Sequence, residues 1–349
     1  MNKDPIPDLR RFLTDRGADH GEIDRAVVEG TLSGLTVECI LMPRRPVYDF
    51  GDVVARAGAD PEIARRMWRA MGYPDLAPSE RAFTDDDVAA LERAAANLGR
   101  ADLELTLQSL RLVSAAMARV AEFLTESTAG QIRTLRQAGL SDAEVAEAVS
   151  VHFDFDETAR ILMYLLRRQT HAAWRRTAPE GEPEGRERTL AVGFVDLVGF
   201  TALSQQLGED ELALTVDRFE TLAYDTIAEH GGRVVKMIGD EVMFVADDAA
   251  AAARISLRLV EHRGERFLPD ARAGVAAGTV VSHDGDYFGP VVNLASRLVN
   301  IAYPRTVVAA PSIRDALGRD PEFTWRSLKP RRLKGIGEMP LWVLRASGD

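Results

Sequence analysis

Two aspartates, each at the end of an apolar run, are the residues best placed to do chemistry. Asp196 lies near the end of the apolar run of residues 190–197, which predicts a buried strand. Asp240 lies in a Gly-Asp turn between two apolar runs, which predicts a β-hairpin. If these strands pair, the two carboxylates meet at one sheet edge. They would then bind a divalent cation such as magnesium, which prefers oxygen ligands. Taken alone, Asp196 has the alternative of a turn or helix-capping role.

Three stretches of the chain resemble the signature of the class III nucleotidyl cyclases. They are FVDLVGFT around Asp196, VVKMIGDEVMF around Asp240, and DYFGPVVNLASRL, which begins at Asp286. They occur in the family's order with family-like gaps, and three stretches in register rarely arise by chance. The resemblance covers residue 188 to about residue 346. It implies conversion of ATP to 3′,5′-cyclic AMP and pyrophosphate, assisted by two Mg²⁺ or Mn²⁺ ions per active site.

The resemblance also implies a role for single residues. Asp196 and Asp240 match the metal-binding aspartates of the family, and Asn293 and Arg297 match its transition-state pair. The latter two are four residues apart and would share one face of a helix. Lys334, in the stretch LKGIG, resembles a phosphate-contacting lysine. That match is looser because the stretch is short and basic clusters are often plain solvated surface.

Lys236 and Asp286 match the positions that select the base in this family. Adenine presents an acceptor at N1 and a donor at its 6-amino group, which a lysine and an aspartate complement. Guanine presents the reverse pattern, and guanylyl members usually carry glutamate and cysteine at these positions. Because a mismatched base leaves buried polar groups unpaired, we expect ATP as the substrate. The chain has no GxxxxGK[ST] loop, so the metals, Arg297 and Lys334 would bind the triphosphate.

The family resemblance has a consequence for assembly. In class III cyclases the metal-binding aspartates come from one chain, and the base-selecting and transition-state residues come from its partner. This chain carries one complete set of these residues. We therefore expect a symmetric homodimer with two composite active sites at its interface.

The elements around these residues predict an α+β chain of two domains. Residues 1–177 consist of successive helical patterns, and the stretch TAPEGEPEGRER that follows is rich in Pro, Gly and charge, which is typical of a linker. The remainder follows a βαββαβ order, which predicts a ferredoxin-like mixed sheet with helices on one face. The predicted domains are an all-α regulatory domain over 1–177, a linker over 178–188 and a cyclase catalytic domain over 189–349.

A helical domain fused to a cyclase is most simply a regulator. It resembles the helical regulatory domains of some actinobacterial cyclases, a few of which respond to acid. His152 and His171 flank the helix before the linker, so a pH switch is one hypothesis. The alternative is that both are ordinary surface or packed histidines. A hydrophobic ligand between the helices is a further hypothesis, although no motif identifies one.

Residues 50–74 have a helix-turn-helix pattern with Arg65, Arg66 and Arg69 on its second helix. The alternative function is therefore a nucleotide-sensing transcriptional regulator, and another is a helical scaffold joined to a degenerate enzyme. The complete set of cyclase residues argues against both. A net charge of −11 also argues against a general nucleic-acid binder.

Composition predicts a cytoplasmic protein. Its 349 residues suffice for two domains, each with its own core. Cys39 is the only cysteine, so an internal disulfide is impossible and a reducing compartment is expected. The N-terminal stretch lacks an apolar signal core, and no run of about eighteen apolar residues occurs that would span a membrane.

Overall fold

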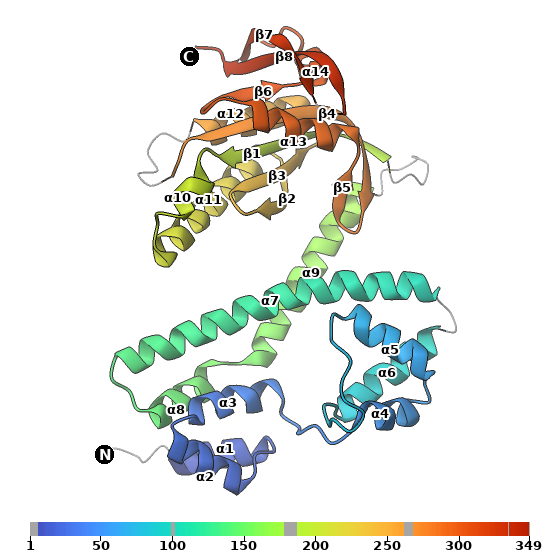
Figure 1. Cartoon of the computed structure of the whole chain (residues 1–349), viewed down its shortest axis with the longest axis vertical. Coiled ribbons are helices and arrows are strands. Elements are labelled where there is room, and N and C mark those ends of the chain that lie inside the picture. Colours follow the sequence, from blue (N-terminus) through green and yellow to red (C-terminus); the bar gives the residue numbers. More distant parts are fainter. Residues whose placement is uncertain (1–5, 99–101, 178–186, 262–267, 334, 349) are drawn as a thin grey trace. The chain divides into compact units, whose positions relative to one another are not determined.

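The computed structural model describes residues 6–98, 102–177, 187–261, 268–333 and 335–348. The chain divides into two compact units, Met1–Pro179 and Glu180–Asp349 (Figure 1). In the described part of the chain, no helix combines the length and apolarity needed to cross a bilayer. The predicted fold class, a helical region followed by a mixed-sheet domain, is confirmed.

In its described residues, the regular secondary structure of the first unit is all helical, apart from one isolated bridge between Tyr48 and Phe83. Its helices are α1 (Ile6–Asp15), α2 (His20–Glu29), α3 (Leu32–Leu41), α4 (Phe50–Ala57), α5 (Pro61–Ala70), α6 (Asp85–Leu98), α7 (Leu103–Gln137), α8 (Asp142–His152) and α9 (Phe155–Thr177). Asp142 joins three of them. Its carboxylate accepts hydrogen bonds from the backbone N of Leu32 at 2.6 Å, from Ser33 Oγ at 2.7 Å and from Arg136 Nη2 at 2.8 Å. The bond from Leu32 gives a partner to the first backbone amide of α3, which has none within the helix.

The arginines of the helix-turn-helix pattern are engaged within this unit. Arg66 of α5 forms an ion pair with Glu104 of α7, and Arg69 forms one with Asp75. The Arg65 guanidinium lies 5.8 Å from the centre of a phenylalanine ring on α4. The second helix of the pattern therefore has two arginines paired with carboxylates of the same chain at the surface, which does not favour a role in binding phosphates of DNA.

The second unit is built on one sheet. Its elements are β1 (Glu187–Leu197), α10 (Phe200–Ser204), α11 (Glu209–Glu229), β2 (Arg233–Ile238), β3 (Glu241–Ala246), α12 (Ala249–Val260), β4 (Ala271–His283), β5 (Asp286–Phe288), α13 (Pro290–Ile301), β6 (Val307–Ala309), α14 (Pro311–Leu317), β7 (Phe323–Leu333) and β8 (Gly337–Ala346). The strand order is β2-β3-β1-β4-β6-β8-β7, and β5 pairs with β4 outside this path. Strand β1 runs antiparallel to both of its neighbours, β3 and β4.

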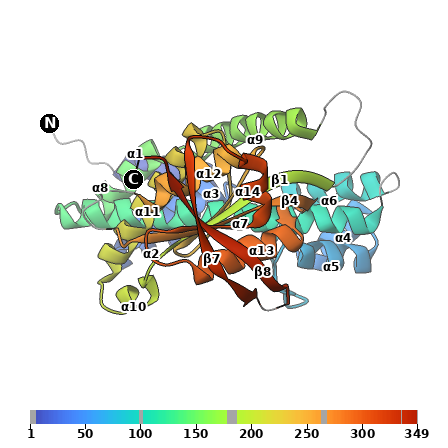
Figure 2. The same ribbon diagram turned by 90° about the horizontal axis from the view of Figure 1, so that it is seen from above.

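Helices cover both faces of the sheet, so the expectation of helices on one face alone is wrong. Val195 of β1 packs in a core with Phe219 of α11 and Ile255 of α12. Phe194, its neighbour, packs in a second core with Leu298 of α13. Figure 2 shows α12 and α14 on one side of the strands and α13 on the other. The reason is that β1 carries apolar side chains on both faces, and each face must be shielded from water.

Gly274 allows α13 to lie directly against the sheet. A Cβ atom at this position of β4 would lie 2.2 Å from the backbone N of Val299 and 2.5 Å from the backbone O of Ala295. Both atoms belong to helix backbone, which cannot rotate away as a side chain could. The absence of a side chain at Gly274 therefore sets how closely α13, the helix of Asn293 and Arg297, approaches β4.

Candidate active site

Three carboxylates, those of Asp196, Asp240 and Glu241, form an acidic edge of the sheet, and strand register brings them together. Asp196 at the end of β1 lies opposite Glu241 of β3 on one side and Arg272 of β4 on the other. Because side chains alternate along strands, these three share the sheet face of Phe194 and Met243, which is the face covered by α13. Strands β1 and β3 thus supply the carboxylates of Asp196 and Glu241, and β4 supplies the guanidinium of Arg272.

Asp240 lies in the turn between β2 and β3, beside Asp196. Its carbonyl accepts a hydrogen bond from the backbone N of Leu197 at 3.2 Å, which ties the turn to the end of β1. Partial burial raises the pKa of the Asp240 carboxyl, and the adjacent Asp196 carboxylate raises it further. The structure therefore brings the two predicted aspartates together at one edge.

Arg272 partly neutralises this edge. Its guanidinium donates to Asp196 Oδ2 from Nε at 2.8 Å and from Nη2 at 2.6 Å. The side chain of Asp196 is only 16% exposed, so an unpaired charge there would be costly. Three carboxylates, those of Asp196, Asp240 and Glu241, face this single guanidinium. The edge keeps an excess of negative charge.

The donor set fits a magnesium or manganese ion. Among the described residues, no group of three or more acidic, histidine or cysteine side chains is arranged to hold a metal by itself. A site built on two carboxylates still suits Mg²⁺, which usually keeps several waters and is held by one or two carboxylates together with substrate phosphates. Asp196 and Asp240 are the residues that would hold such ions.

Lys236 of β2 and Asp286 of β5 meet although they are 50 residues apart, and their side chains form an ion pair. The backbone N of Tyr287 donates to the other carboxylate oxygen of Asp286 at 2.8 Å. Lys236 is 38% exposed and Asp286 is 26% exposed. The pair thus presents a donor and an acceptor side by side, with both groups still reachable from solvent.

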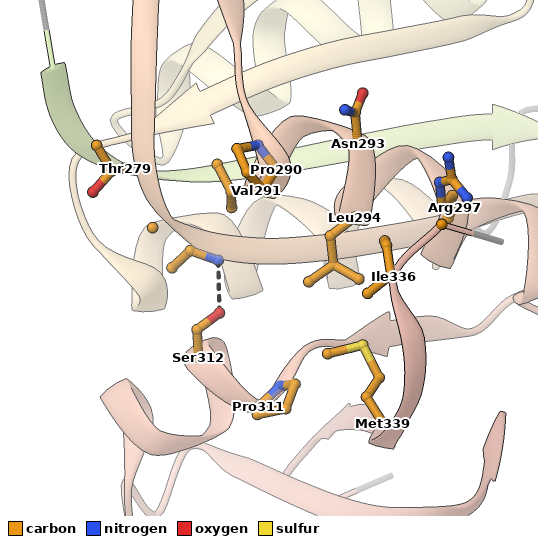
Figure 3. Close-up of a pocket in the computed structure, with 13 residues that line it drawn as sticks. Thr279, Pro290, Val291, Asn293, Leu294, Arg297, Pro311, Ser312, Ile336 and Met339 are labelled. Carbon is orange, nitrogen blue, oxygen red and sulfur yellow. Dashed lines mark hydrogen bonds between the residues drawn. The ribbon is translucent and has the colours of Figure 1, made fainter. Parts of the chain in front are cut away.

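Asn293 and Arg297 lie one turn apart on α13 and line a cavity of about 670 Å³. Figure 3 shows their side chains on the same side of the helix. The cavity continues over β4, the start of α14, the β7–β8 connection and the start of β8, where Ile336 of the connection and Met339 of β8 contribute apolar walls. Gly335 lies beside the Arg297 guanidinium, since a Cβ atom at this glycine would be 3.8 Å from the guanidinium nitrogens, an ordinary contact distance.

The cavity and the acidic edge do not share residues within one chain. The residues lining the cavity come from β4, α13, α14, β8 and the segment before β8, and they include neither Asp196 nor Asp240. In the sheet, β6 and β8 lie on one side of β4, whereas β1 and β3 lie on the other. Lys334 lies outside the described residues.

The family model of the adenylate and guanylate cyclase catalytic domain matches residues 183–346. The chain is 36% identical to an adenylate cyclase of Streptomyces coelicolor over 374 residues, covering 99% of this chain and 93% of that protein. The chain belongs to the class III adenylyl cyclases. The prediction of an adenylate cyclase is therefore confirmed, and catalytic domains of this class generally use divalent metal ions.

Other relatives of this adenylyl cyclase span both units. It is 37% identical to an adenylate cyclase of Streptomyces griseus, covering 81% of this chain and 72% of that protein. It is 30% identical to a pH-sensitive adenylate cyclase of Mycobacterium tuberculosis, covering 93% of this chain and 86% of that protein. Among solved structures, the adenylyl cyclase CyaB from P. aeruginosa aligns with 46% of this chain and 95% of that chain, at 22% identity and a TM-score of 0.42.

The structure adds Glu241 and Arg272 to the candidate site. Sequence analysis missed both. Glu241 follows Asp240 directly, so its proximity to the acidic turn was visible, but its side-chain direction depends on the pairing of β3 with β1. Arg272 is 76 residues from Asp196, and no local pattern links them. Burial raises the pKa of Glu241 to about 7, with further contributions from the charges of Asp196 and Asp240.

This raised pKa predicts a pH-dependent stability of the metal-free cyclase. Between the ordinary carboxyl pKa and about 7, the folded chain binds the Glu241 proton more tightly than the unfolded chain does. The contribution of Glu241 to the free energy of unfolding is fully present when the pH is below the pKa of Glu241 in the unfolded chain. It is lost as the pH rises through about 7, the pKa in the folded chain. With a chelator present, we expect Glu241→Gln to have a higher Tm than wild type at pH 8 and a similar Tm near pH 5. Glu229→Gln, an exposed change on α11, is the control. An equal difference at both pH values would contradict the prediction.

Proposed function

We propose that this adenylyl cyclase works as a homodimer with two composite sites, each built from two copies of the chain. One copy would supply the acidic edge. The other would supply the base-reading pair and the α13 residues, namely Lys236, Asp286, Asn293 and Arg297. The observation that carries the proposal is that the acidic edge and the cavity of Arg297 have separate linings within one chain. A second copy related by a two-fold axis can bring the two halves together.

The proposed reaction is an in-line displacement at the α-phosphorus of ATP. The ribose 3′-oxygen forms a bond to phosphorus, the bond to the pyrophosphate oxygen breaks, and the hydroxyl proton passes to solvent water. Two Mg²⁺ or Mn²⁺ ions held by Asp196 and Asp240 would acidify the 3′-hydroxyl and neutralise the triphosphate. Arg297 stabilises the charge that grows on the α-phosphate. Asn293, one turn away on the same side of α13, orients the ribose for attack.

Selection of ATP is assigned to Lys236 and Asp286. The lysine donates to N1 of adenine and the carboxylate accepts from the 6-amino group. What supports this assignment is that the two side chains already lie together, with the Asp286 carboxylate held by Lys236 and by the backbone N of Tyr287. A fixed donor beside a fixed acceptor discriminates more strongly than either group alone.

The helical unit is proposed to regulate the catalytic unit. A cavity of about 530 Å³ among α3, α7 and α9 has an almost wholly apolar lining that includes Met117, Leu124 and Phe155, and it suits an apolar ligand. His152 lines a second cavity between α7 and α8, and His171 lies exposed on α9. One relative is named as pH-sensitive, which supports protonation as a second candidate signal.

Cyclic AMP formation from ATP with manganese tests this function. We would compare the full-length chain, its Arg297→Ala variant and the 186–349 fragment across pH 5.5 to 8. The fragment is expected to be active, and the full-length chain should show a different pH profile if the helical unit regulates it. Arg297→Ala should lower kcat by roughly 10²- to 10³-fold, the size of losing one charge-stabilising group. An active Arg297→Ala variant, or a fragment that dimerises without making cyclic AMP, would contradict the catalytic assignment.

A further inference from the structure

Strand β2 contains a β-bulge immediately before Lys236. Val234 lies opposite Phe244 of β3, but Lys236 lies opposite Met243, so Val235 has no partner of its own. Phe244 belongs to the core under α11 and α12, whereas Met243 belongs to the core under α13. The extra residue therefore places Lys236 on the α13 face.

Without the bulge, this lysine would point the other way. Arg233 lies opposite Val245, whose side chain is in the α13 core. In a regular strand, residues three apart point to opposite faces. Lys236 would then lie on the face of α11, away from Asp286. Bulges commonly re-aim a side chain beside a functional site, and here the bulge puts Arg233 and Lys236 on one face.

The partner of Lys236 lies on an element with little backbone support. β5 has three residues and, among the described strands, pairs only with the end of β4. The loop between them, Asp284 and Gly285, has φ angles of 52° and 78°, as a two-residue type I′ hairpin requires. A two-stranded hairpin by itself is marginally stable in water. Side-chain contacts must therefore hold β5 in place relative to β2.

Arg233 and Tyr287 supply such a contact. Arg233 Nη2 donates to Tyr287 Oη at 2.6 Å, and the guanidinium carbon lies 5.3 Å from the centre of the tyrosine ring. Tyr287 is 7% exposed, and its backbone N holds the Asp286 carboxylate. Two links thus run in parallel between β2 and β5: the ion pair of Lys236 with Asp286, and the Arg233–Tyr287 contact next to it.

We propose that Arg233 and Tyr287 are positioning residues that set the preference for ATP over GTP. They do so by fixing the order in which the Lys236 ammonium and the Asp286 carboxylate face the edge of the base, so the inference rests on the proposed base-reading role of that pair. Guanine carries its donor and acceptor at the same two ring positions as adenine but in reverse order, so a donor held at N1 and an acceptor held at position 6 match adenine only. If β5 moves relative to β2, the lysine can reach O6 of guanine and the carboxylate its N1, and the mismatch no longer leaves groups unpaired.

The test uses full-length protein and three substitutions. Tyr287→Phe removes one hydroxyl and keeps the buried ring, and Arg233→Met removes the donor at similar length. Arg254→Gln is the matched control, since it breaks an arginine contact of α12 with Glu322 away from the site. For each we would measure kcat and KM for ATP, the inhibition constant of GTP against ATP, and Tm.

For Tyr287→Phe and Arg233→Met we expect KM for ATP to rise and the inhibition constant of GTP to fall, each by about three- to tenfold, the worth of one hydrogen bond. The kcat should change less than about threefold on the same scale. Arg254→Gln should leave the ratio of the KM for ATP to the inhibition constant of GTP unchanged. The inference is overturned if both variants keep the wild-type ratio, including the case in which only Tm falls.

A Lys236→Ala arm separates this inference from the function on which it rests. If Lys236→Ala shifts the preference and the Arg233 and Tyr287 variants do not, the positioning role alone fails. If Lys236→Ala leaves the preference unchanged, the base-reading assignment fails and the positioning role fails with it.

Discussion

A mixture of Asp240→Ala and Asn293→Ala chains is expected to recover roughly a quarter of the wild-type turnover, although either variant alone should be slower by about 10²- to 10³-fold. The reason is the composite site. Random mixing makes about half of the dimers heterodimers. In each heterodimer one site combines the two mutated halves, and the other combines two intact halves. Cyclic AMP formation before and after exchange of subunits measures the recovery.

Asp196→Ala mixed with Asp240→Ala provides the matched control for this mixing experiment. Both variants damage the same acidic edge, which lies within one chain. Every site in the heterodimer then carries one damaged edge, so no recovery is expected. Recovery in this control, or none in the first mixture despite heterodimers shown by differential tagging, would refute the shared site.

Replacing Lys236 by Glu and Asp286 by Cys in the same chain is expected to lower kcat/KM for ATP by about 10²-fold or more and to make GTP the better substrate. Adenine then meets an acceptor where it needs a donor, and its polar groups lose their partners on leaving water. Guanine gains an acceptor for its N1 and a weak donor for its O6. The kcat/KM for each nucleotide, measured under the same conditions, gives the switch directly.

The single variant Lys236→Glu is the informative companion of this double variant. It faces Asp286 with a second carboxylate where the structure has an ion pair, and like charges at that distance repel. We expect it to lose ATP turnover without acquiring GTP turnover, and to have a lower Tm than the double variant. A double variant that folds and still prefers ATP would show that other residues select the base.

The regularity of local patterns explains how much of the fold could be predicted. The apolar run before Asp196 and the Gly-Asp turn at Asp240 predict a strand and a hairpin from backbone preferences alone, and the structure has β1, β2 and β3 there. The expectation that helices cover only one face of the sheet was wrong. Strand β1 has apolar side chains on both faces, so helices must cover both. Lys334 lies outside the described residues, so its role stays a prediction.

The sequence by itself determined the family and its candidate residues, because short stretches of fixed spacing are written directly along the chain. Only the tertiary structure decided which of these residues meet. Strand register set Arg272 and Glu241 against Asp196, and a one-residue bulge turned Lys236 toward Asp286. A shift of one residue in register moves every side chain to the opposite face, and register depends on pairing between segments far apart in sequence. The candidate residues could therefore be predicted one by one along the chain. Their arrangement required the folded chain, because register depends on this pairing.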